Sequence, residues 1–67
     1  MEREPVSSEA LRSVGYQDGT LEIEFVTGSI YQYFDVPERV YEELRMAESK
    51  GAFFQTHIRA QFRYARV

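Results

Sequence analysis

The chain has 67 residues, a formal net charge of −3 at pH 7, five tyrosines, five phenylalanines, one histidine and no cysteine. This length suits a single small domain, in which large aromatic rings supply much of the buried apolar area. Without cysteine there is no disulfide or thiolate chemistry, which suits the reducing cytoplasm, and one histidine leaves no pair for a zinc or iron site. We therefore expect no metal and no cofactor. No apolar run reaches membrane-spanning length, so we also expect no membrane contact.

The first half of the chain has the pattern of antiparallel strands. Residues 1–5 are charged and short of apolar side chains, which predicts a loose N-terminal tail, and Ser7-Ser8 are expected to cap or bulge the start of the first strand. Asp18-Gly19 predicts a type I′ turn, because both central residues of that turn need positive φ. This turn pairs Tyr16 with Leu21.

The second hairpin turn contains Thr27-Gly28, and a β-branched threonine is poorly suited to positive φ. A three-residue loop, 26–28, with Gly28 left-handed in a G1 bulge fits better and pairs Leu21 with Tyr33. The two registers agree, and they predict one shared apolar face of a meander. That face holds Val14, Tyr16, Leu21, Ile23, Phe25, Tyr31 and Tyr33.

The second half predicts two helices. Asp35-Val36-Pro37 resembles a helix start, with Asp35 as a cap and Pro37 at the first helical position, and an amphipathic pattern continues to about Glu48. Ser49 fits an N-cap of a shorter helix that ends near Ile58. Residues 61–67 alternate well enough to form a fourth strand. The fold class is therefore α+β: a three-stranded antiparallel meander, extended by this fourth C-terminal strand if it forms, packed on one main helix and one short helix in a single domain over residues 1–67.

Several short motifs carry a family resemblance. They are Val6-Ser7-Ser8, Gly15-Tyr16, Phe25, Gly28, the run from Ile30 to Pro37, Ser49-Lys50-Gly51, Phe53-Phe54 and Ile58-Arg59. With this set the chain resembles the KTSC domain, named after the C-terminus of some lysyl-tRNA synthetases, over roughly residues 6–66. The family has no settled activity. The synthetase context implies a non-catalytic accessory module that binds RNA, with tRNA as the expected partner.

Charge is distributed unevenly along the chain. Residues 1–48 hold all eleven acidic residues and four arginines, a balance of −7, whereas residues 49–67 hold four basic residues and no acid, a balance of +4. Basic side chains interleaved with aromatic rings can contact phosphates and stack on bases. The candidate RNA-binding residues are Lys50, Arg59, Arg63, Tyr64 and Arg66. Those arginines could equally pair with helix carboxylates. The register places Tyr31 and Tyr33 under a helix, as core residues.

A protein-interaction module, including a homodimer, is the alternative function, favoured by the acidic balance. It would use a sheet edge or a patch on the second sheet face formed by Ile30 and Phe34. Catalysis is not expected, because His57 has neither a strained nucleophile turn nor a group to orient it. The glutamates of the first helix lack the spacing of a calcium loop and are interpreted as a solvated face.

Overall fold

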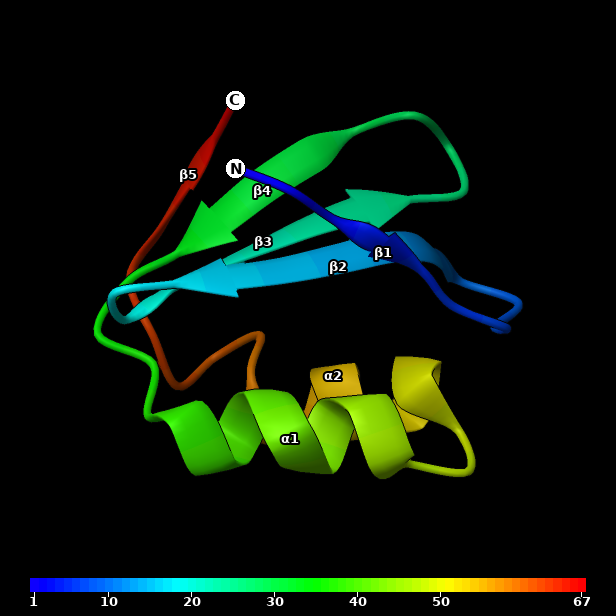
Figure 1. The fold of residues 1–67 in the computed structure, drawn as a ribbon. Helices are drawn as coiled ribbons and strands as arrows, with labels where there is room; N and C mark the ends of the chain where they lie inside the picture. The colour runs from blue at the N-terminus through cyan, green and yellow to red at the C-terminus, as the bar shows by residue number, and fades with distance from the viewer.

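Two tight turns organise the molecule into a five-stranded antiparallel sheet with both helices on one face (Figure 1). The computed structural model describes all residues, 1–67. The strands lie in chain order across the sheet. The elements are β1 (Glu4–Pro5), β2 (Leu11–Gln17), β3 (Thr20–Phe25), β4 (Ile30–Tyr33), α1 (Glu38–Met46), α2 (Lys50–His57) and β5 (Tyr64–Arg66). Neither helix has the length and apolar character needed to cross a membrane.

The α+β class is confirmed, and the predicted meander forms the centre of the sheet. Asp18 and Gly19 have φ of 51° and 83°, as a type I′ turn requires, and Tyr16 pairs with Leu21. Gly28 has φ of 96° in the three-residue loop, and Leu21 pairs with Tyr33. The predicted fourth strand is β5, which pairs with β4. The helices differ from the prediction, because α1 and α2 are nearly equal, with 9 and 8 residues.

The prediction of a loose N-terminal tail was wrong. Glu4 and Pro5 pair with Val14 and Ser13 of β2, so β1 is a fifth strand at the sheet edge. Just before it, Arg3 donates a hydrogen bond from Nε to Ser13 Oγ at 2.9 Å and forms an ion pair with the buried carboxylate of Glu22. A polar network therefore fastens this segment to the sheet face opposite the helices.

The start of α1 also differs from the prediction. Pro37 is the N-cap, and no side chain caps the helix, so Asp35 does not cap it. Asp35 instead has φ of 57°, a left-handed conformation that turns the chain from β4 toward α1. Two hydrogen bonds hold this crossing. Val36 N–H donates to the Gly19 carbonyl at 2.9 Å, and Tyr16 Oη donates to the Val36 carbonyl at 2.5 Å.

The core lies between the sheet and the two helices. Its buried side chains are Leu11, Val14, Leu21, Ile23, Tyr33, Val36, Val40, Leu44, Phe54 and Ile58. Four of the seven side chains predicted on the shared face of the meander are in this set, whereas Tyr16, Phe25 and Tyr31 are only partly buried; Phe25 and Tyr31 are the two nearest α2 and β5. Those two rings pack at the margin of the core, where Phe25 meets Phe54 of α2 edge to face at 5.2 Å and Tyr31 at 5.9 Å.

Candidate nucleic-acid interface

An aromatic groove lies between α2 and the β4–β5 end of the sheet. Its volume is about 720 Å³, within the range of small-ligand sites. The lining residues are Phe25, Tyr31, Tyr33, Phe54, Gln55, Arg59, Ala60 and Tyr64. None of them is acidic, although the chain as a whole carries a net charge of −3. The groove is therefore the part of the surface where aromatic rings and a free cation occur together.

The register of β5 builds one wall of this groove. Tyr33 pairs with Tyr64, and Tyr31 with Arg66, so these four side chains share the helix-side face of the sheet. The Tyr64 ring centroid lies 5.9 Å from that of Tyr31 and 5.7 Å from that of Tyr33. Phe54 of α2 meets Tyr33 edge to face at 5.5 Å. Such contacts fix the ring positions before any ligand arrives.

Exposure decreases from the rim of the groove to its floor. Tyr64 is 59% exposed at the rim, Tyr31 is half-buried, and Tyr33 is only 4% exposed at the floor. Burial raises the pKa of Tyr33 to about 12, the neighbouring Tyr31 and Tyr64 add to the rise, and Arg59 opposes it. Tyr33 therefore keeps its phenolic proton at neutral pH and can donate a hydrogen bond.

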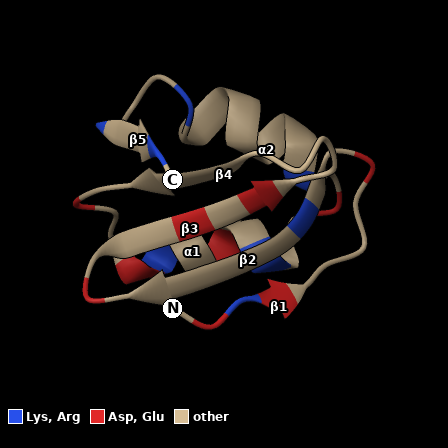
Figure 2. Cartoon of the chain, turned by 90° about the horizontal axis from the view of Figure 1, so that it is seen from above, with Lys and Arg blue, Asp and Glu red and all other residues tan.

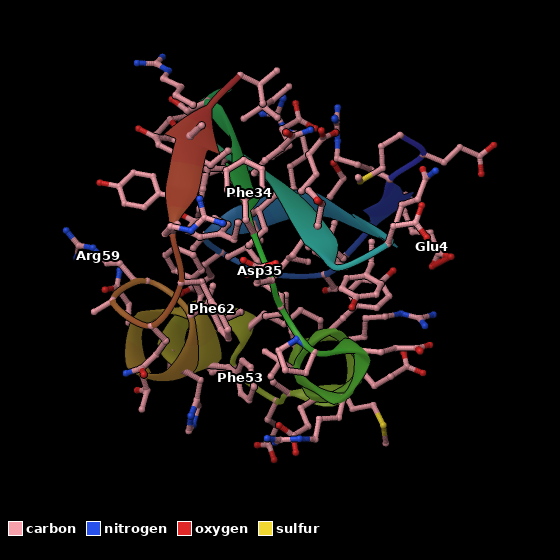
Figure 3. The ribbon with its side chains drawn as sticks, turned by 90° about the vertical axis from the view of Figure 1, so that its left-hand side faces the viewer. Glu4, Phe34, Asp35, Phe53, Arg59 and Phe62 are labelled. Carbon is pink, nitrogen blue, oxygen red and sulfur yellow. The ribbon has the colours of Figure 1, made fainter.

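Two arginines flank the rings. Arg59 is exposed in the loop after α2, on the same side of the molecule as β5, and its Nη1 donates to Gln55 Oε1 at 3.0 Å (Figure 3). Arg66 Nη2 lies 3.4 Å from Ser29 Oγ. Neither forms an ion pair with a carboxylate, so both guanidinium groups are free to meet an anion. Figure 2 shows acidic residues on β1, β3, α1 and the turns, and none on β5.

The five predicted RNA-binding residues do not form one site. Arg59 and Tyr64 line the groove, and Arg66 is on the same face of the sheet but not in the lining. Arg63 lies elsewhere, in an exposed ion pair with Asp35 at 2.9 Å and over the Phe34 ring at 5.7 Å. Lys50 begins α2, where its Nζ donates to the Ala47 carbonyl at 3.0 Å, at the other end of the helix from Arg59. Sequence reasoning also missed Gln55, whose place at the groove depends on how α2 docks.

The predicted interaction patch is divided. Ile30 and Phe34 lie at opposite ends of β4, both half-buried, with Gln32 between them on the same face. Gln32 Nε2 donates to Glu22 Oε1 at 2.8 Å, which makes the middle of this face polar. The C-terminal segment runs beside β4 as β5, and of the two side chains Phe34 is covered in part by Arg63.

The other titratable and hydroxyl side chains have structural roles. His57 is exposed, with its ring centroid 4.6 Å from that of Phe53. Ser8 Oγ accepts hydrogen bonds from the Ala10 and Leu11 amides, and Ser49 caps α2 by accepting from the Ala52 amide, both as predicted. No group of three or more histidine, aspartate or glutamate side chains is placed to hold a metal ion.

These features define a small α+β domain with one aromatic, basic groove, and comparison with known proteins places it in a family. The KTSC domain model matches residues 7–62, so the chain belongs to the KTSC domain family, as the motifs predicted. A KTSC domain protein of Yersinia pestis has the same fold, with a TM-score of 0.93 at 40% identity over 98% of this chain and 96% of that one.

Two further relatives differ in size. An uncharacterized protein of Stutzerimonas stutzeri is 39% identical over 70 residues, which cover 100% of this chain and 99% of the relative. A lysine–tRNA ligase of Nostoc sp. is 52% identical over 48 residues, which cover 72% of this chain but 9% of the ligase. The chain therefore spans less than a tenth of the length of that ligase. The family thus includes both free-standing domains and regions of a larger enzyme, and nothing in the domain itself points to catalysis.

Proposed function

We propose that this domain is a non-catalytic module that binds RNA weakly through the groove between α2 and β5. The observation that carries the proposal is the exposed Tyr64 ring beside Tyr31 and Arg59, in a lining without carboxylates. Aromatic rings stack on bases of any sequence, and arginine neutralises the adjoining phosphates. Four of the seven arginines pair with acids, whereas Arg59 and Arg66, like Arg39 on α1, do not.

We infer that the RNA is tRNA. The support is the 52% identity to a region of a protein named lysine–tRNA ligase. An accessory module on such an enzyme would act at high effective concentration, so weak intrinsic binding would suffice. Binding to tRNA would place the domain in the cytoplasm, in agreement with its lack of cysteine.

The number of phosphate contacts sets the salt dependence. With Arg63 paired to Asp35 and Lys50 at the far end of α2, Arg59 and Arg66 remain, which is about two phosphates. The slope of log affinity against log salt should then be roughly −1 to −2, because single strands release about 0.7 ions per contact. The acidic residues elsewhere reduce the affinity further, since they repel the polyanion.

The test is a fluorescence-anisotropy titration of labelled tRNA at several salt concentrations. Arg59→Glu combined with Arg66→Glu should abolish binding. The matched control combines Arg39→Glu with Lys50→Glu, which changes the net charge equally but lies outside the groove. The control should weaken binding only through the overall charge. Equal loss in both double variants, or no binding of the wild type at low salt, would refute the proposal.

The alternative proposal is a protein-interaction module that uses the sheet edge at β5. Tyr64, Ala65 and Arg66 are exposed there, and Val67 is 70% exposed. An unpaired edge strand can add a strand from a partner or from a second copy. This edge is poorly suited to self-pairing, because β5 has only three residues and carries positive charge at Arg66 and, just before it, at Arg63. Sedimentation at high protein concentration decides whether a dimer forms, and dimers that Phe34→Glu dissolves would favour the Ile30 and Phe34 face instead.

A further inference from the structure

The floor of the groove carries a hydroxyl group without a partner in the chain. The side-chain hydrogen bonds include the hydroxyl of Tyr16 but not that of Tyr33, and no buried side-chain oxygen or nitrogen lacks a partner. The Tyr33 hydroxyl oxygen is therefore not fully buried, although the residue as a whole is only 4% exposed. Because Tyr33 lines the groove, its O–H is a fixed donor and acceptor at the floor.

The lining holds a second polar group, the Gln55 carboxamide. Gln55 on α2 accepts from Arg59 Nη1 through Oε1, which orients the carboxamide and leaves its NH₂ donors without a partner in the chain. Arg59 keeps the rest of its guanidinium fork free. The lining of the groove thus combines a hydroxyl, an amide and a cation with several aromatic rings.

This set of rings, neutral polar groups and one cation is chemically complementary to a single nucleotide. A nucleobase has a flat face for Tyr64 and Tyr31, a hydrogen-bonding edge for Tyr33 and Gln55, and a neighbouring phosphate for Arg59. Inside a duplex both faces of a base are stacked and its Watson–Crick edge is paired, so a duplex cannot present all three. Unpaired bases of loops and ends can.

We propose, as an extension of the proposed function, that the groove selects single-stranded RNA by accepting one unpaired nucleobase, with the Tyr33 hydroxyl and the Gln55 amide contacting its edge. Tyr64 and Tyr31 supply the stacking surface, and Arg59 binds the adjacent phosphate. The sequence preference is then set by two neutral polar groups, and it is independent of the charge-driven part of the affinity.

The experiment compares short single-stranded homopolymers of U, C and A with a blunt, loop-free RNA duplex and with tRNA. Single strands should bind at least about tenfold more tightly than the duplex, and Tyr64→Ala should reduce single-strand affinity about tenfold or more. Tyr33→Phe removes only the hydroxyl, so it should alter the ranking of U, C and A by about two- to tenfold. Gln17→Ala, an exposed glutamine at the far end of β2, is the matched control for Gln55→Ala and should change nothing.

The outcomes separate the two proposals. A preference for single strands together with a ranking changed by Tyr33→Phe supports the inference. Equal binding of the duplex, or an unchanged ranking in Tyr33→Phe and Gln55→Ala, overturns the inference while RNA binding itself stands. No binding of tRNA or of any single strand overturns both.

Discussion

Replacing Gly15 with alanine tests how the N-terminal segment is held. Gly15 is buried in β2, and a Cβ built there overlaps the Glu2 carbonyl oxygen and lies 3.2 Å from Arg3 Cγ. The segment would have to move away from the sheet. Its movement would break the hydrogen bond from Arg3 to Ser13 and the ion pair from Arg3 to Glu22.

The expected magnitude follows from two opposing terms. Losing charge-assisted hydrogen bonds to a buried carboxylate costs about 1.5–3 kcal/mol, partly offset by water reaching Glu22. Alanine in a strand gains about 0.5–1 kcal/mol over glycine. Gly15→Ala should therefore destabilise the protein by about 1–2 kcal/mol.

Urea unfolding of four proteins measures the coupling. The second variant deletes Glu2 and Arg3, so that Met1 directly precedes Glu4, and the third carries both changes. Without the segment, Gly15→Ala should become neutral or stabilising by about 0.5–1 kcal/mol. Equal destabilisation in both backgrounds, or no effect in the full chain, would refute the close crossing of residues 2 and 3 over Gly15.

Three further predictions concern the core, a turn and pH. Leu44→Ala should cost about 2–5 kcal/mol, much of the stability of so small a domain, and thermal unfolding should show it. Gly28→Ala should destabilise by about 1 kcal/mol because its φ is 96°, and a stabilised variant would contradict the bulge. Burial disfavours the Glu22 carboxylate, but hydrogen bonds from Gln32 and Arg3 outweigh it and lower its pKa. The carboxylate therefore stabilises the folded protein fully above its pKa in the unfolded chain, about 4.3, and this stabilisation is lost as pH falls through its lower pKa in the folded protein. In Glu22→Gln the free energy of unfolding should therefore depend less steeply on pH in the acid range.

Local chemistry explains which parts of the fold were predictable. Asp18-Gly19 and Gly28 require positive φ, and each fixes a register that decides which side chains face the helices. β1 was not predicted, because a glutamate followed by a proline, Glu4-Pro5, has no alternating apolar pattern that would indicate a strand. Its pairing depends on a salt bridge from Arg3 to Glu22 and on the small size of Gly15.

The candidate site was predictable in part, for a related reason. The alternation of residues 61–67 suggested β5, but only its pairing with β4 shows that Tyr64 and Arg66 share the helix-side face of the sheet while Arg63 meets Asp35. The direction of α2 separates Lys50 from Arg59, which residue counting along the chain cannot reveal. Asp35 was expected to be a cap because it precedes Val36-Pro37, yet the turn after β4 needs its left-handed φ.

The central claim is that the groove between α2 and β5 contacts RNA. The most direct test is an NMR titration of isotope-labelled protein with tRNA, followed at each backbone amide. The account predicts that shifts concentrate at Tyr31, Tyr33, Gln55, Arg59 and Tyr64, and that Lys50 and the outer face of α1 stay unchanged. Shifts centred on α1 or on the sheet face around Gln32, or none at saturating tRNA, would contradict it.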